Sequence, residues 1–93
     1  MTVRVFRSRR ADLEVEEIAE YLTEFSLPAA RRFLEVLERA QRQLSEFPDS
    51  GAPGTRPGTR RLVVGDYIVS YRRRGADIEI FAVRHASRRD SRS

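Results

Sequence analysis

Arginines around the predicted strands of the second half are the side chains best suited to chemistry in this chain. They are Arg56, Arg60, Arg61, Arg84, Arg88 and Arg89. A guanidinium group offers five donors in a planar fork that suits phosphates and carboxylates. Antiparallel pairing of the strands would bring some of these arginines together. The pattern predicts a surface that binds phosphates or an acidic partner, with ordinary solvated arginines as the alternative.

His85 follows Arg84 directly at the end of the last predicted strand. An imidazole beside cations could act as general acid or base in RNA cleavage. That reaction needs a base for the 2′-hydroxyl, an acid for the leaving oxygen and cations for the phosphorane. His85 alone supplies one of these groups, so a structural or surface histidine is the alternative.

Positive charge is concentrated in the second half of the chain. All 18 basic residues are arginine, and the net charge is +4. Residues 1–50 carry 8 arginines and 10 acids, whereas residues 51–93 carry 10 arginines and 4 acids. This asymmetry predicts an anionic partner for the second half, either nucleic acid or an acidic protein segment.

Metal and cofactor sites are not expected. The chain has no cysteine and one histidine. Acids of the first predicted helix could be considered as ligands, but they are spread round the helix and fit a solvated face better. They are Glu14, Glu16, Glu17, Glu20 and Glu24. Tyr67 and Tyr71, two residues of one strand face, could stack on bases, although their spacing favours packing.

Two helices are predicted in the first half. Ser8 is a suitable N-cap, and Ala11, Val15, Ile18, Leu22 and Phe25 then recur at the spacing of one helical face. A short break at 26–28 starts a second helix, which Pro48 ends. The short break indicates a helical hairpin.

Strands are predicted at 3–6, 61–64, 67–73 and 77–83. Residues 48–58 are rich in glycine and proline and are expected to form a long loop. Ile78, Ile80 and Ala82 should share one face of the last strand, which carries apolar residues on both faces and should therefore be central. The order is β-α-α-β-β-β, a two-layer α+β fold with the N-terminal helical hairpin packed on a mostly antiparallel four-stranded sheet.

A single domain, residues 1–93, is expected, with a flexible tail at 86–93. A chain this short has little room for a deep substrate cavity, so a surface completed by a partner is easier to build. It has no apolar run of membrane-spanning length, and its charged start differs from a signal peptide. A cytoplasmic protein is expected.

This order of elements resembles the RelE/ParE superfamily of type II toxins, over nearly the whole chain. The matching features are Ala11 to Leu13, Ile18 and Tyr21; Ala30, Phe33 and Leu37; Leu44, Phe47, Pro48 and Gly51; Arg61, Leu62, Gly65 to Tyr67 and Tyr71; and Ile78 to Ile80, Val83 and His85. The resemblance implies a growth-inhibiting toxin in a hetero-oligomer with a cognate antitoxin. RelE-like members cleave mRNA on the ribosome, whereas ParE-like members poison DNA gyrase.

The chain departs from the RelE pattern and looks closer to the ParE group. Ile68 stands where an arginine typically follows the tyrosine of the middle strand, and the chain has neither a lysine nor a tyrosine after Tyr71. The resemblance thus implies a gyrase-binding toxin without catalytic residues. The seven target-binding candidates are Arg56, Arg60, Arg61, Arg84, His85, Arg88 and Arg89.

Two alternatives stay open. One is an mRNA endonuclease that uses Arg60, Arg61, Arg84 and His85. The other is a non-toxic binding module. In all three cases an antitoxin with apolar anchors and acidic residues is the expected protein partner. Gyrase or ribosome-bound mRNA is the target of the two toxic forms.

Overall fold

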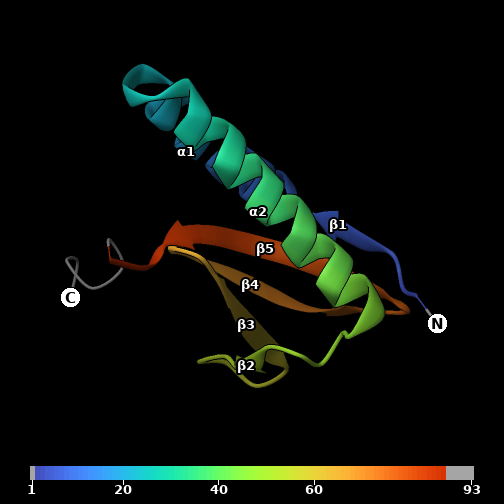
Figure 1. Ribbon diagram of the computed structural model, residues 1–93. Helices are drawn as coiled ribbons and strands as arrows, with labels where there is room; N and C mark the ends of the chain where they lie inside the picture. Colours follow the sequence, from blue (N-terminus) through green and yellow to red (C-terminus); the bar gives the residue numbers. More distant parts are fainter. Residues whose placement is uncertain (1, 88–93) are drawn as a thin grey trace.

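Two helices form one layer of the molecule, and a five-stranded sheet forms the other (Figure 1). The computed structural model describes residues 2–87. The elements are β1 (Val5–Arg7), α1 (Arg9–Phe25), α2 (Leu27–Glu46), β2 (Ala52–Pro53), β3 (Thr59–Val64), β4 (Tyr67–Arg74) and β5 (Asp77–His85). The predicted α+β class and the predicted order of the helices and longer strands are confirmed.

The prediction of four strands is wrong by one short edge strand. β2 lies inside the segment 48–58 that was expected to be a loop, and it pairs antiparallel with β3. Ala52 lies opposite Arg61, and Pro53 lies opposite Arg60. A proline fits an edge strand because it has no N–H to donate. A two-residue strand shows no alternation, so the sequence pattern could not indicate it.

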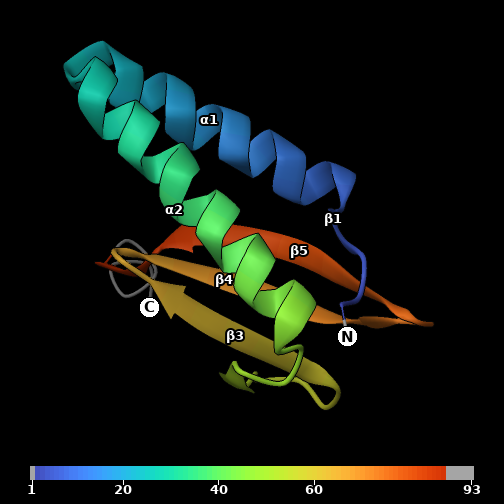
Figure 2. The same ribbon diagram turned by 45° about the vertical axis from the view of Figure 1, so that its right-hand side comes forward.

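A single residue separates the two helices. The N–H of Ser26 donates to the Leu22 carbonyl of α1 (2.8 Å), and its Oγ accepts from the N–H of Ala29 in α2 (3.2 Å). Ser8 caps the start of α1 in the same way, by accepting from the N–H of Ala11 (3.1 Å). Side-chain caps satisfy N–H groups that have no partner in the first helical turn. The predicted hairpin is confirmed, and its helices run side by side (Figure 2).

The sheet has the strand order β1-β5-β4-β3-β2. Only β1 and β5 pair in parallel among the described strands, so the predicted mostly antiparallel sheet is confirmed. The predicted central position of the last strand is also confirmed, because β5 lies between β1 and β4. Gly65 and Gly75 turn the chain between the three long strands, with φ angles of 58° and 62° that other residues rarely adopt.

A β-bulge interrupts the pairing of β4 with β5. Ser70 lies opposite Ala82, but the next residue, Tyr71, lies opposite Ile80. Phe81 is therefore the extra residue of β5. One extra residue reverses the alternation of side chains along the rest of the strand.

The bulge overturns the predicted faces at the end of β5. Ala82 was expected to share the face of Ile78 and Ile80, but Val83 joins them in the core, and Ala82 lies on the opposite face. The backbone N–H of Val83 donates to Oε1 of Glu14 in α1 (2.8 Å). Glu14 therefore has a structural partner and does not belong to the solvated face assigned to the helix acids.

The core lies between the helical hairpin and the sheet. Its best buried residues are Ala11, Phe33, Leu37, Ala40, Leu44, Val69, Tyr71, Ile78, Ile80 and Val83. The predicted packing role of the two strand tyrosines is confirmed, because Tyr71 is 1% exposed and Tyr67 packs on Phe33 with ring centroids 4.7 Å apart.

The Tyr71 hydroxyl fastens the segment that follows α2. It donates to the Pro48 carbonyl (2.9 Å) and accepts from the N–H of Gly51 (2.9 Å). A Cβ at Gly51 would lie 2.7 Å from this hydroxyl, so only glycine fits here without a shift. A buried side chain of the sheet thus holds the start of the predicted loop in place.

The turn end of the hairpin extends beyond the sheet (Figures 1 and 2). Tyr21, Phe25 and Leu27 are exposed there by 47%, 72% and 50%. We call these three residues the apolar tip. Phe25, which its spacing placed on the apolar face of the first helix, is exposed because no strand lies beneath this end. Neither helix within residues 2–87 is long and apolar enough to cross a membrane.

Candidate anion-binding site

A hollow lined by arginines lies on the face of the sheet that the helices leave open. Its volume is about 240 Å³. Its charged lining residues are Arg10, Arg56, Arg60, Arg61 and Arg84. Hydroxyl side chains of Thr55, Thr59 and Ser70 also line it. No acid among the described residues lines this space, which we call the cationic hollow.

Strand register places Arg61 and Arg84 in the hollow. Arg61 lies opposite Ser70, and Arg84 lies opposite Ile68. Both of these β4 residues alternate with Val69, which is buried under the helices. Because neighbouring residues of a strand point to opposite faces, the two arginines point away from the helices.

A tight turn before β3 brings Arg56 to the same hollow. The Arg56 carbonyl accepts from both the N–H (3.2 Å) and the Oγ1 hydroxyl (2.7 Å) of Thr59. The N–H of Gly54 donates to the Thr59 carbonyl (2.8 Å), which closes the turn. A Cβ at Gly54 would collide with Oγ1 of Thr59, so a glycine is required at this close approach.

Arg60 lines the hollow but serves mainly as a structural residue. Its Nη1 donates to the Gly51 carbonyl (2.8 Å), and its Nε lies 3.7 Å from Oδ1 of Asp49. Together with the Tyr71 hydroxyl, this guanidinium holds the segment after α2 against the sheet. Arg60 was predicted as a member of the binding surface, but in the structure its guanidinium contacts groups of the protein itself.

The guanidinium groups of Arg56, Arg61 and Arg84 remain open to a ligand. None of them makes a hydrogen bond or an ion pair within residues 2–87. Arg10 adds a fourth cation, although its Nε lies 3.3 Å from Oε2 of Glu14. Sequence analysis missed Arg10, because only the packing of α1 along β5 brings the first helix to this hollow.

His85 faces the other side of the sheet. It lies opposite Tyr67, with the two ring centroids 5.2 Å apart, and its Nδ1 is 2.7 Å from Oγ of Ser87. Its surroundings form a separate groove of about 400 Å³, lined also by Ile18 and Leu22 of α1. The structure therefore does not combine His85 with Arg61 and Arg84 as the endonuclease alternative requires.

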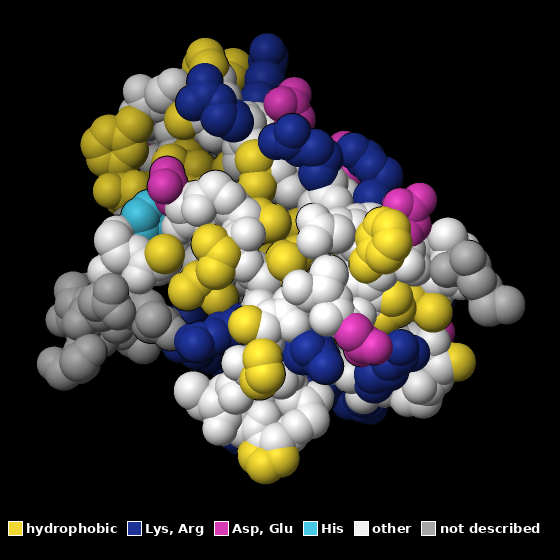
Figure 3. All heavy atoms as spheres, turned by 60° about the horizontal axis from the view of Figure 1, so that its bottom comes forward, with side chains coloured by type: hydrophobic (Ala, Val, Ile, Leu, Met, Phe, Trp, Pro, Cys, Tyr) yellow, Lys and Arg dark blue, Asp and Glu magenta, His cyan; other side chains and the backbone are white. Residues whose placement is uncertain are grey.

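Beside the hollow, the open face carries two arginines that share one acidic partner. Glu79, only 7% exposed, accepts from Nε of Arg72 (3.0 Å) and from Nη1 of Arg74 (3.2 Å). The Arg72 guanidinium also covers the Phe81 ring, 5.3 Å from its centroid. On this face, the arginines without an acidic partner therefore lie at the hollow. Figure 3 shows arginines prevailing over acids on the lower part of the molecule, with hydrophobic side chains gathered at one upper end.

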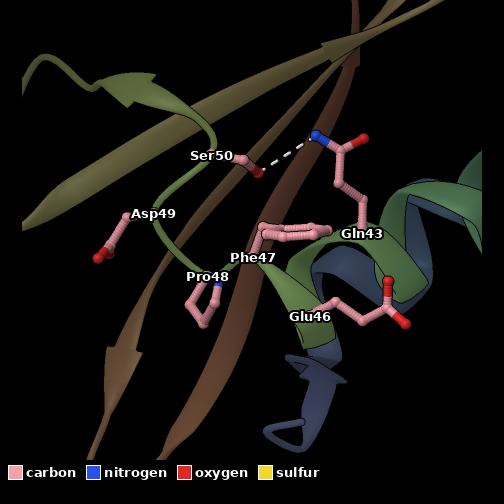
Figure 4. Close-up of a pocket in the computed structure, with 6 residues that line it drawn as sticks. All are labelled: Gln43, Glu46, Phe47, Pro48, Asp49 and Ser50. Carbon is pink, nitrogen blue, oxygen red and sulfur yellow. Dashed lines mark hydrogen bonds between the residues drawn. The ribbon is translucent and has the colours of Figure 1, made fainter. Parts of the chain in front are cut away.

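A larger hollow of about 750 Å³ lies at the end of α2 but lacks converging charges. Figure 4 shows the side chains of Gln43 and Ser50 pointing toward each other beside the Phe47 ring. The Gln43 Nε2 donates to Oγ of Ser50 (3.2 Å). We therefore regard the smaller, arginine-lined hollow as the candidate site.

Two of the predicted site residues, Arg88 and Arg89, lie outside the described residues, as does most of the predicted tail. Within residues 2–87, no group of three or more histidines and acids is placed to hold a metal ion.

Comparison with known proteins shows a consistent family pattern. Residues 5–90 match a family described as ParE toxin of the type II toxin–antitoxin system parDE. The chain is 38% identical to Y4kP, a candidate toxin of Sinorhizobium fredii, over 85 residues that cover 89% of this chain and 88% of the relative. It is 32% identical to the toxin RelE2 of Caulobacter vibrioides over 79 residues, which cover 85% of this chain and 90% of that relative.

Among solved structures, the fold matches a chain of the chromosomal ParDE system of P. aeruginosa with a TM-score of 0.77. The match covers 90% of this chain and 96% of that chain. At 18% identity, this likeness concerns the fold.

Proposed function

This chain belongs to the ParE toxin family of type II toxin–antitoxin systems, and we propose that it inhibits growth by binding DNA gyrase without cleaving RNA. As a member of this family, it has an antitoxin as its partner in a hetero-complex. The proposal concerns the cellular target and the surface that contacts it.

The observation that supports binding over cleavage is the separation of Arg84 from His85. Arg84 lines the cationic hollow, whereas His85 lies against Tyr67 on the helix side of the sheet. RNA cleavage needs a proton-transferring group within hydrogen-bond reach of the reacting oxygens. An arginine stays protonated and cannot readily act as a base. The free donors of the hollow suit the holding of an anion.

We further propose that the antitoxin neutralises the toxin with two kinds of contact. Acidic residues would meet Arg56, Arg61 and Arg84, and apolar side chains would cover the apolar tip. Ion pairs on an exposed surface weaken as salt rises, because the Debye length falls from about 10 Å at 0.1 M to about 3 Å at 1 M. If the toxin–antitoxin Kd is the same at both salt concentrations, the acidic contact is wrong.

The endonuclease alternative makes an opposite prediction for His85. If His85 were a general acid or base, its replacement by alanine would lower activity by about 10²-fold or more. We expect instead that His85→Ala stays as toxic as the natural chain, provided that the two proteins accumulate equally.

The deciding experiment has two parts. The toxin is induced in cells and the resulting damage is identified, and the purified toxin is assayed with purified gyrase. We expect DNA-damage signalling in cells and inhibition of supercoiling, or trapping of cleaved DNA, with purified gyrase. Rapid translation arrest with messages cut at the ribosomal A site, and gyrase unaffected, would overturn the proposal. Growth that continues without the antitoxin would instead identify a non-toxic binding module.

A further inference from the structure

We propose that the cationic hollow holds backbone phosphates of double-stranded DNA, so that the toxin engages gyrase together with the DNA that gyrase holds. The choice of DNA rests on the proposed function. The phosphate contact itself rests on the side chains that line the hollow, and it can be tested without gyrase.

Three separate segments supply the free donors of the hollow. Arg56 comes from the turn before β3, Arg61 from β3 and Arg84 from β5. One arginine fork is enough to satisfy the two oxygens of a carboxylate. Several forks converging on one hollow fit a phosphate better, because its oxygens accept from more directions. The hydroxyls of Thr55 and Ser70 add donors of the kind that commonly contact phosphate oxygens.

The surroundings favour a duplex over a single strand. Proteins that bind single-stranded nucleic acid usually stack its bases on exposed aromatic rings. On the open face, the Phe81 ring is covered by the Arg72 guanidinium, and the Phe6 ring is covered by that of Arg4 at 4.8 Å. A guanidinium group thus already occupies one face of each ring. What the face offers is cations for a backbone whose bases are already paired.

The charge on this face is also local. Glu79 pairs with both Arg72 and Arg74, and Asp77 pairs with Arg4 at 3.1 Å, so acids offset two of these three positive charges. The free guanidinium groups therefore define a short track of a few phosphates. Such a toxin should bind naked DNA weakly and in a salt-dependent way.

The test measures binding of a short labelled DNA duplex to the purified full chain by fluorescence anisotropy over a range of salt. The double variant Arg61→Gln with Arg84→Gln removes two free cations of the hollow. Arg39→Gln is the matched control, because Arg39 is an exposed arginine of α2. We expect the double variant to lose about 10-fold or more in affinity at 0.1 M salt and about 2 units of the salt slope, one for each lost phosphate contact. The control should differ by less than about 2-fold, as expected for a cation without a phosphate contact.

The same proteins are then assayed with gyrase, which separates the two proposals. If the natural chain poisons gyrase but binds no duplex, the phosphate inference is wrong and the proposed function stands. If it binds duplex through the hollow but leaves gyrase active, the phosphate site stands and the gyrase target is wrong. Tighter binding to single-stranded RNA than to duplex would also overturn the inference. So would a toxin that binds polyglutamate but not DNA.

Discussion

The apolar tip and the cationic hollow are two exposed features of this small protein, and they are built in opposite ways. The tip consists of side chains that the sheet does not cover, because the helical hairpin extends beyond its end, and Phe25 is 72% exposed there. The hollow is assembled from a turn, three strands and the start of α1, and its arginines are held by a fixed register. The tip is a projection, whereas the hollow is a concave site.

This difference separates two kinds of recognition. Exposed aromatic and aliphatic side chains gain affinity by burial, which depends little on the exact placement of each atom. Charge-assisted hydrogen bonds depend on donor geometry. We therefore expect the tip to contribute affinity for the antitoxin only, whereas the hollow contacts the target and is covered by antitoxin acids in the neutralised complex.

The largest loss of gyrase inhibition is expected from Arg61→Gln combined with Arg84→Gln. Each charged hydrogen bond contributes about 1.5–3 kcal/mol, so losing two should weaken gyrase inhibition by about 100-fold or more. The measurement is the toxin concentration that halves supercoiling. Phe25→Ser, at the tip, serves as the control and should inhibit as well as the natural chain. Equal loss in both proteins would mean that the two features do not have separate roles.

Tyr71→Phe tests how far the hollow depends on the buried support beneath it. The change removes a hydroxyl that bonds both Pro48 and Gly51. We expect the free energy of unfolding to fall by about 1–3 kcal/mol, because a buried N–H and a carbonyl lose their partner. Chemical denaturation gives this value. Hydrogen exchange should rise at residues 48–58 and stay unchanged in α1; a uniform rise would contradict the local role.

The tip should matter for the antitoxin. Phe25→Ser with Leu27→Ser replaces two exposed apolar side chains and should weaken antitoxin binding by about 10-fold, the effect of 1.4 kcal/mol at an interface. Calorimetry of the purified partners measures this. The variant should keep its toxicity and become harder to neutralise. Unchanged antitoxin affinity would show that the tip is not the apolar contact.

The smallest effect is expected at His85, which lies outside both features. His85→Gln keeps a polar side chain that can still bond Ser87, and we expect gyrase inhibition and antitoxin affinity to change by less than about 2-fold, as for most surface substitutions. A large loss of toxicity in a normally folded variant would show that His85 takes part in the toxic activity.

Local patterns were sufficient to predict most of the fold. Ser8 and Ser26 cap the two helices, and the glycines at 65 and 75 turn the chain between the long strands. These features depend on neighbours within a few residues, so the sequence displays them. The family resemblance was likewise confirmed, because it rested on their order along most of the chain.

The candidate site was predicted only in part, because its composition depends on contacts between distant segments. Arg61 and Arg84 were recognised from their places at strand ends, but the capture of Arg60 by Gly51 and the approach of Arg10 from α1 are tertiary effects. The exposure of Phe25 follows from where the sheet ends, which helical periodicity does not encode.

The extra residue at Phe81 has a consequence for the evolution of such toxins. If Phe81 were kept without the bulge, strict alternation from Ile80 would turn residue 84 toward the helices and residue 85 toward the hollow. The side chains of Arg84 and His85 would then exchange faces of the sheet with no change in either residue. Substitutions that remove or restore the bulge are therefore a short mutational path between a sheet that presents an imidazole and one that presents a guanidinium.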